Sequence, residues 1–244
     1  MPFFEGVNGR VHFRRWPAPR PRVVLVFLHG LGQQSADYHR FARAMNRHDI
    51  DVWGIDHAGH GLSEGEADRH APVEELAADA LTLVARAERE HGGLPLVLMG
   101  HSLGAGTALI AMRSEAAAVT AVHAVVLIGT PPQAEAWRVP APPVPTLALH
   151  GCDDRRAPVE RIRRWATGET LVELVEFPDA GHDLLHEPVR RQVARTIVDF
   201  MERQARSVTA ESRSAAVWPG GFGQQEGDSA AASMVRSIVS AIAR

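Results

Sequence analysis

Short, mainly apolar stretches alternate along the chain with longer segments in which every third or fourth residue is apolar. The short stretches predict strands buried on both faces of a sheet, and the longer segments predict helices with one buried face. Strands that alternate with helices indicate an α/β fold, with a mostly parallel sheet of about eight strands flanked by helices. The expected strands of the parallel part lie at residues 23–28, 51–56, 96–100, 122–128, 146–150 and 171–177.

An antiparallel hairpin is expected before the first buried strand. Asn8-Gly9 separates Phe3–Glu5 from Val11–Phe13, and Asn-Gly is typical of a two-residue hairpin turn. Helices are expected wherever the apolar positions repeat at helical spacing or a capping residue precedes such a repeat. They lie from Ser35 to about Arg47, at residues 73–91 (stripe Leu76, Ala80, Leu83, Ala87), at residues 159–167, and from Glu187-Pro188 onward (stripe Val189, Val193, Ile197, Phe200).

The composition changes at about residue 206, where Ser, Ala, Gly and Gln become frequent. Residues 1–205 are expected to form one domain and residues 206–228 a linker-like segment. Residues 229–244 predict a C-terminal amphipathic helix, with an apolar stripe at Met234, Val235, Ile238, Val239 and Ile242. Three arrangements remain open for this helix: a cover over the functional site, a homodimer contact, or loose packing on the surface.

Composition and charge narrow the class of protein. The 244 residues carry a net charge of −3 and no basic block, which argues against a nucleic-acid partner. The N-terminus does not resemble a signal peptide and no apolar run could cross a bilayer, so we expect a cytoplasmic location without stable membrane insertion. Cys152 is the single cysteine, which excludes a disulfide within the chain, and we expect it to be a packing residue.

One stretch carries a recognisable chemical motif. Residues 96–106 run from an apolar strand into Gly100-His101-Ser102-Leu103-Gly104 and then into small, helix-forming residues. This is the nucleophile-elbow pattern, in which a sharp turn between strand and helix exposes a serine. Only small neighbours tolerate that turn, which explains the glycines two positions before and after Ser102.

A serine hydroxyl becomes a useful nucleophile only when a base removes its proton and a third group holds the base. His182 follows the last expected strand, within Asp179-Ala-Gly-His182. Asp153 and Asp154 both follow the strand at residues 146–150, and the residue pattern alone leaves either as the acid.

Five segments together resemble the α/β-hydrolase superfamily, and most closely its monoacylglycerol lipase and lysophospholipase branch. They are His29–Gly32, Asp56–Ser63, Gly100–Gly104, His150–Asp154 and Gly181-His182. The resemblance implies the α/β-hydrolase fold for residues 1–205 and the chain order serine, acid, histidine. The chain departs from that branch between the strands at 122–128 and 146–150. Its short, proline-rich segment there predicts a minimal cap where the branch has a sizeable one.

The resemblance also implies roles for individual residues. Ser102 would be the nucleophile, His182 the base, and Asp154, in preference to Asp153, the acid. The backbone N–H groups of Leu31 and Leu103 would form the oxyanion hole.

No cofactor and no metal ion is expected. His182 and His186 have the spacing of two zinc ligands on a helix, but the glutamate of a zinc-protease helix is missing. His57, His60, His101 and His150 are expected to pack and form hydrogen bonds within loops.

These features predict a serine hydrolase that cleaves carboxylic esters of small molecules through an acyl-enzyme. The short segment before residue 146 predicts an open acyl pocket, which favours small to medium or monoacylglycerol-like acyl groups. Hydrolysis of acyl thioesters and acyl transfer to an acceptor other than water are the alternatives. A non-catalytic receptor on the same fold is disfavoured, because the sequence supplies a complete set of catalytic residues.

Overall fold

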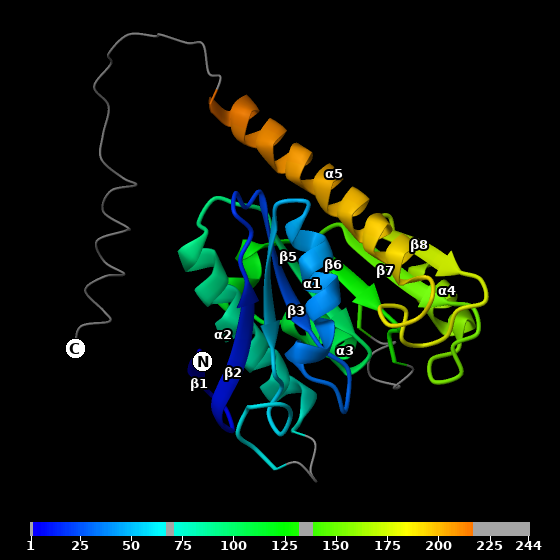
Figure 1. Ribbon diagram of the computed structural model, residues 1–244. Coiled ribbons are helices and arrows are strands. Elements are labelled where there is room, and N and C mark those ends of the chain that lie inside the picture. The colour runs from blue at the N-terminus through cyan, green and yellow to red at the C-terminus, as the bar shows by residue number, and fades with distance from the viewer. Residues whose placement is uncertain (1, 67–70, 132–138, 217–244) are drawn as a thin grey trace, which may run out of the picture. The chain divides into compact units, whose positions relative to one another are not determined.

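The computed structural model describes residues 2–66, 71–131 and 139–216. Eight strands form one sheet in the order β1-β2-β4-β3-β5-β6-β7-β8 (Figure 1). β3 to β8 are parallel, whereas β2 is antiparallel to both β1 and β4. The strands are β1 (Phe3–Gly6), β2 (Gly9–Trp16), β3 (Val23–Leu28), β4 (Ile50–Ile55), β5 (Leu96–His101), β6 (Val122–Ile128), β7 (Thr146–Gly151) and β8 (Val172–Phe177). The predicted α/β fold and eight-stranded sheet are therefore confirmed.

The N-terminal hairpin is present, but its turn lies one residue earlier than the sequence predicts. Gly6 pairs with Gly9, so Val7 and Asn8 form the turn and Gly9 already belongs to β2. Gly9 has a φ of 106°, in a region that side chains rarely adopt. The glycine is needed here because it starts the second strand with a positive φ.

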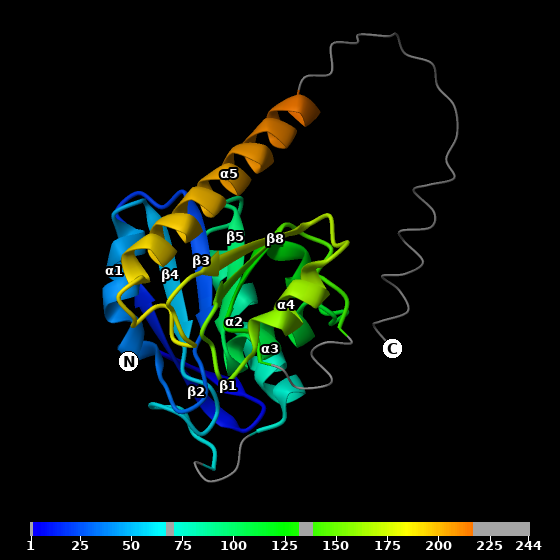
Figure 2. The same cartoon turned by 90° about the vertical axis from the view of Figure 1, so that its right-hand side faces the viewer.

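Helices cover both faces of the sheet, as Figures 1 and 2 show from two directions. On one face, α1 and α5 pack against β-strand side chains such as Leu25, Phe27 and Val126. On the other face, α2 and α3 pack against the alternate residues of the same strands, such as Val24 and Val26. The helices are α1 (His39–Asn46), α2 (Val73–Glu90), α3 (Leu103–Ala111), α4 (Val159–Ala166) and α5 (Arg190–Ala216), with short 3₁₀ helices at Ser35–Tyr38 and Ala117–Ala121.

This alternation explains why the strand sequences are apolar throughout. All six residues of β3, β4, β5 and β7 are buried, because each strand has a helical layer on both sides. The predicted helical stripes are buried as well: Leu76, Ala80, Leu83 and Ala87 on α2, and Val193, Ile197 and Phe200 on α5. Val189, the first residue of the second predicted stripe, precedes α5 and is only half-buried.

Helix α5 differs from the prediction at both ends. It begins at Arg190, after Pro188, rather than at Glu187-Pro188. It then continues to Ala216, so residues 206–216 are helical although the sequence pattern suggested a linker. The reason is that this stretch contains Ser and Ala but no glycine or proline, and Ala is the best helix former. Residues 1–209 form one compact unit. The predicted helix at 229–244 lies outside the described residues.

The segment between β6 and β7 is the expected place for a cap. Residues 129–131 and 139–145, the part of it that the structure describes, contain no helix or strand. None of the described helices is both long and apolar enough to cross a membrane.

Candidate active site

Ser102 lies at the sharp turn between β5 and α3. Its backbone has φ 52° and ψ −114°, a strained conformation that residues other than glycine rarely adopt. The amide of Ser102 donates a hydrogen bond to the carbonyl of Ile128 at the end of β6 (2.9 Å), which anchors the turn to the neighbouring strand. The turn has the geometry that the nucleophile-elbow motif predicts.

Two glycines make this turn sterically feasible. A Cβ atom on Gly100 would lie 2.1 Å from the carbonyl oxygen of Gly104, and one on Gly104 would lie 2.2 Å from the carbonyl oxygen of Leu28. Both contacts involve backbone, which cannot move aside as a flexible side chain would. The glycines at these positions are therefore required by packing between β3, β5 and α3.

The structure brings together the three side chains that were predicted as nucleophile, base and acid. Nε2 of His182 lies 2.8 Å from Oγ of Ser102, and Nδ1 of His182 lies 2.7 Å from Oδ2 of Asp154. Asp154 follows β7 and His182 follows β8, so the carboxyl ends of neighbouring parallel strands supply both residues. Asp153 is exposed, whereas the Asp154 side chain is fully buried.

The hydrogen bonds around Asp154 determine its charge and orientation. Burial alone raises the pKa of this carboxyl, but hydrogen bonds from His182 and from the amides of Ala157 and Arg156 outweigh burial and lower the pKa below its ordinary value. Both amides donate to Oδ1 at 2.8 Å, which leaves Oδ2 for His182. Asp154 is thus ionised at neutral pH and can accept a hydrogen bond from Nδ1 of His182, an arrangement that leaves Nε2 facing Ser102.

The two predicted oxyanion-hole residues lie beside this arrangement. Leu103 is the first residue of α3, where a backbone N–H has no acceptor within the helix. Leu31 follows β3 and lines the same cavity as Ser102 and His182, a cavity of about 550 Å³. Their role as hydrogen-bond donors to an oxyanion stays a prediction.

Glu187 holds the loop that carries His182, a role that the sequence analysis did not identify. Its carboxylate accepts hydrogen bonds from the amides on both sides of the histidine, Gly181 (2.7 Å) and Asp183 (3.0 Å). These two hydrogen bonds hold the loop backbone on both sides of His182 and thereby position its imidazole. No sequence pattern marks this role, because it depends on how the loop folds back before α5.

A second set of hydrogen bonds connects the loops around the site. Oε1 of Gln33 accepts from the amide of Gly30 (3.0 Å) and from the hydroxyl of Tyr38, and Nε2 of Gln33 donates to Asp183 (3.2 Å). The Tyr38 hydroxyl is also 3.1 Å from Nδ1 of His101. Gln33 thereby joins the loop after β3 to the loop of His182, and the sequence analysis missed it because 150 positions separate Gln33 from Asp183.

The other histidines pack within loops, and most form the expected hydrogen bonds. His57 is an exception: its buried ring packs against His29 with centroids 4.6 Å apart, but neither ring nitrogen has a hydrogen-bond partner among the described residues. Nδ1 of His29 donates to the carbonyl of Gly30 (2.8 Å), and Nε2 accepts from the amide of His57 (2.9 Å). Nε2 of His150 donates to the carbonyl of Ala157 (2.6 Å) and so supports the loop of Asp154. His60 packs against His29 with ring centroids 5.2 Å apart. Throughout residues 2–66, 71–131 and 139–216, no group of three or more His, Cys, Asp or Glu side chains is arranged to hold a metal ion.

Known proteins are similar to this chain in fold, and in sequence they match the part of the chain that contains Ser102. A family model for the serine aminopeptidase family S33 matches residues 19–137, which include Ser102 but neither Asp154 nor His182. Monoacylglycerol lipase from Mycolicibacterium smegmatis is 36% identical over 105 residues, covering 42% of this chain and 38% of the relative. Human monoglyceride lipase is 30% identical over 153 residues, covering 61% and 50%.

The structural comparison extends over most of the chain. A solved structure of Est1E from Butyrivibrio proteoclasticus superposes with a TM-score of 0.73 at 16% identity, covering 84% of this chain and 99% of Est1E. The curated relatives named above are matched over half of their length or less. The fold, the strained serine turn and these similarities agree: the chain has the α/β-hydrolase fold and is similar in sequence to monoacylglycerol lipases over part of its length.

Proposed function

We propose that this chain is a serine hydrolase that cleaves carboxylic esters, with Ser102, His182 and Asp154 as its catalytic triad. The observation that carries the proposal is the continuous contact from Ser102 Oγ to His182 Nε2 (2.8 Å) and from His182 Nδ1 to the buried Asp154 carboxylate (2.7 Å). The similarity to monoacylglycerol lipases supports an ester as the substrate.

The proposed reaction has two halves. Ser102 Oγ attacks the acyl carbon while its proton passes to Nε2 of His182, and the amides of Leu31 and Leu103 stabilise the oxyanion. The tetrahedral intermediate then expels the alcohol, which takes the proton from His182, and leaves an acyl group on Ser102. In the second half, water gives a proton to His182 and attacks the acyl carbon, and the carboxylic acid leaves as Ser102 regains its proton.

The acyl group is proposed to be small or medium in length. The described part of the segment between β6 and β7 is short and irregular, and Pro131 within it lines the cavity together with Leu31 and Arg156. The whole cavity measures about 550 Å³, in the middle of the range of roughly 300–1,000 Å³ for small-molecule sites. A cavity of this size suits a small or medium ester better than a long acyl chain that must be buried along its length.

A panel of p-nitrophenyl esters and acyl thioesters of increasing chain length tests this function. We expect ester hydrolysis with a maximum at short or medium acyl chains, and a loss of about 10⁴-fold or more in the Ser102→Ala variant. Ser207→Ala, a serine exposed on α5, is the matched control and should retain full activity. A clear maximum at long acyl chains would contradict the proposed acyl length, and hydrolysis that survives Ser102→Ala would contradict the triad.

The same panel separates the alternative reactions. Preferred turnover of thioesters would identify a thioesterase. An acyl-enzyme that stays intact in water, seen by mass spectrometry, but releases its acyl group to an added alcohol or amine would identify an acyltransferase.

A further inference from the structure

A groove between α1 and α5 lies outside the proposed active site. It has a volume of about 500 Å³, which is within the range of small-molecule sites. Its lining shares no residue with the cavity that contains Ser102 and His182. The two helices lie on the same face of the sheet (Figures 1 and 2), and side chains from both helices line the groove.

The floor of the groove is apolar. Three of its side chains come from α1, two from α5, and one from the loop that carries His182; they are Phe41, Ala44, Met45, Ala194, Val198 and Leu185. Ala44 and Ala194 contribute only a methyl group each, so the floor stays low between the two helices. Such a strip can accommodate an alkyl chain, whose transfer from water is favourable by about 0.8 kcal/mol for each buried CH₂ group.

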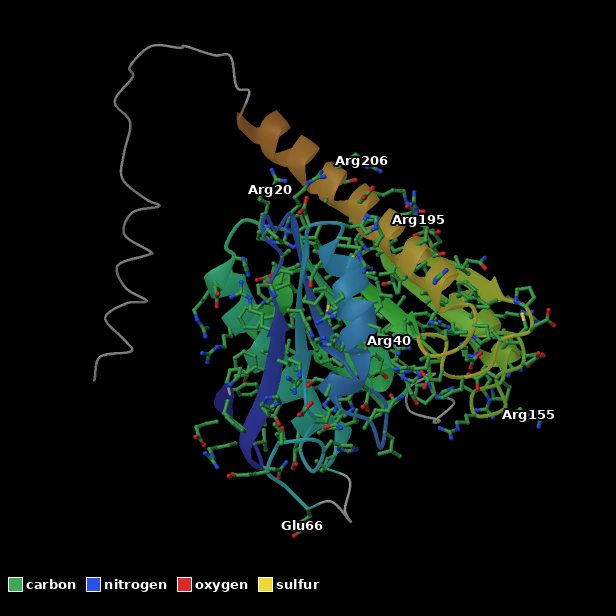
Figure 3. All side chains as sticks on the ribbon, in the orientation of Figure 1. Arg20, Arg40, Glu66, Arg155, Arg195 and Arg206 are labelled. Atoms are coloured by element: carbon green, nitrogen blue, oxygen red, sulfur yellow. The ribbon has the colours of Figure 1, made fainter. Side chains whose placement is uncertain are left out.

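The rim of the groove is strongly basic. Among the described residues, five arginines and one histidine line it and no carboxylate does: Arg40, Arg47, His48, Arg190, Arg191 and Arg195. Figure 3 labels one arginine from each wall, Arg40 on α1 and Arg195 on α5. Overall composition does not explain this gathering of positive charge, because the whole chain carries a net charge of −3.

Most of this positive charge has no counter-ion in the part of the chain that the structure describes. Arg195 pairs with Asp199 (2.9 Å) and His48 lies 3.9 Å from Glu202. Among the described residues, no carboxylate forms an ion pair with Arg40, Arg47, Arg190 or Arg191. Guanidinium groups that face one another across a groove repel, and an oxyanion between them removes the repulsion and accepts paired N–H donors.

We propose that this arginine groove binds a single-chain amphiphile with an oxyanion head group. The alkyl chain lies on the apolar floor, and the head group contacts arginines from both helices. A recess with cations on two walls fits one such molecule, whereas a flat bilayer surface would contact the rim alone. The inference is independent of the proposed ester hydrolysis, because it rests on residues that the hydrolytic site does not use.

Titration calorimetry with dodecanoate, below the concentration at which it forms micelles, tests the proposal. We expect saturable binding by the full chain that weakens as salt is added, because the rim is exposed. The double variant Arg40→Gln/Arg191→Gln should lower the affinity at least tenfold. Arg43→Gln is the matched control, since Arg43 is an exposed arginine of α1 that does not line the groove, and it should bind as the parent does.

A second variant tests the apolar floor separately. Ala194→Phe places a ring where the alkyl chain would lie, and should abolish dodecanoate binding while thermal unfolding shows a folded protein. Dodecanol, which lacks the charge, and acetate, which lacks the chain, should each bind at least tenfold more weakly than dodecanoate. Equal binding of dodecanol or of acetate would overturn the proposal, as would affinity unchanged by both groove variants.

The location of the ligand is checked by photo-crosslinking. A long-chain fatty acid that carries a diazirine should label peptides from α1 and from the first half of α5. Labelling confined to peptides that contain Ser102 or Pro131 would place the ligand in the ester site and overturn the proposal. Binding to anionic lipid vesicles without any binding of monomeric dodecanoate would identify a membrane surface as the occupant instead, and would also overturn it.

Discussion

Nε2 of His101 donates a hydrogen bond to the backbone carbonyl of His182 (3.1 Å), so the residue before the proposed nucleophile holds the residue proposed as its base. Burial lowers the pKa of His101 to about 4, and its ring is therefore neutral at pH 7. A carbonyl can only accept, so the single proton of the neutral ring lies on Nε2. Nδ1 then faces the hydroxyl of Tyr38 (3.1 Å), whose own proton is donated to Oε1 of Gln33.

Replacement of His101 by phenylalanine should therefore impair catalysis more than substrate binding. The change keeps an aromatic ring but leaves the carbonyl of His182 without its donor, at a cost of about 1–3 kcal/mol. We expect kcat to fall about 10- to 100-fold with little change in KM, measured on a p-nitrophenyl ester. Tyr38→Phe removes a hydroxyl that donates to Gln33 and leaves the bond to the His182 carbonyl in place, so it should have a smaller effect. An unchanged kcat in His101→Phe would show that this hydrogen bond does not position His182.

The buried histidine His29 predicts a specific dependence of stability on pH. Burial lowers the pKa of His29 to about 4, and the hydrogen bonds agree with a neutral ring because Nε2 accepts from the amide of His57. In the unfolded chain the pKa is near 6.5, so the folded state binds fewer protons between the two values. The contribution of His29 to stability is complete above pH 6.5 and is lost as the pH falls toward 4.

Urea unfolding at pH 7.5, 6 and 5 measures this effect. We expect the free energy of unfolding to decrease toward pH 5 by at most about 2 kcal/mol from His29, because pH 5 lies about 1.5 units below the unfolded pKa and each unit is worth about 1.36 kcal/mol. His29→Asn keeps polar groups but does not titrate, so this variant should lose less stability than the parent between pH 7.5 and 5. Parallel pH curves for the parent and His29→Asn would exclude the histidine as the cause.

Glu187 provides a test of the loop that carries His182. Glu187→Gln replaces one carboxylate oxygen with an NH₂ group, which then faces a backbone N–H of Gly181 or Asp183 instead of accepting from it. We expect kcat to fall about tenfold or more, since two donors that now oppose each other displace the loop. Glu173→Gln, an exposed carboxylate on β8 that pairs with Arg203, is the control and should change kcat less than twofold. Equal effects of the two substitutions would contradict the role of the Glu187 carboxylate in holding this loop.

Local sequence patterns predicted much of this molecule, and the missed features are those that depend on distant contacts. The apolar runs placed β3 and β6 at the observed residues, because a strand covered on both faces must be apolar throughout. Ser102 was recognisable because its turn requires glycines at fixed positions. In contrast, the pairing of Gln33 with Asp183 and the groove between α1 and α5 arise only when remote segments pack together, and no local pattern encodes them.

Two glycines of α3 provide a matched pair that separates packing from helix propensity. Gly104→Ala places a Cβ 2.2 Å from the carbonyl oxygen of Leu28, whereas a Cβ on Gly106 meets only a proline side-chain atom at 3.8 Å. Gly104→Ala must therefore separate α3 from β3, and we expect a loss of 3 kcal/mol or more, roughly the cost of severe overpacking, together with inactivity. Gly106→Ala should stabilise the protein by about 0.5–1 kcal/mol, because alanine favours a helix over glycine by that amount. Urea unfolding of both variants measures the difference, and a tolerated Gly104→Ala would mean that the turn at Ser102 does not require close contact between β3 and α3.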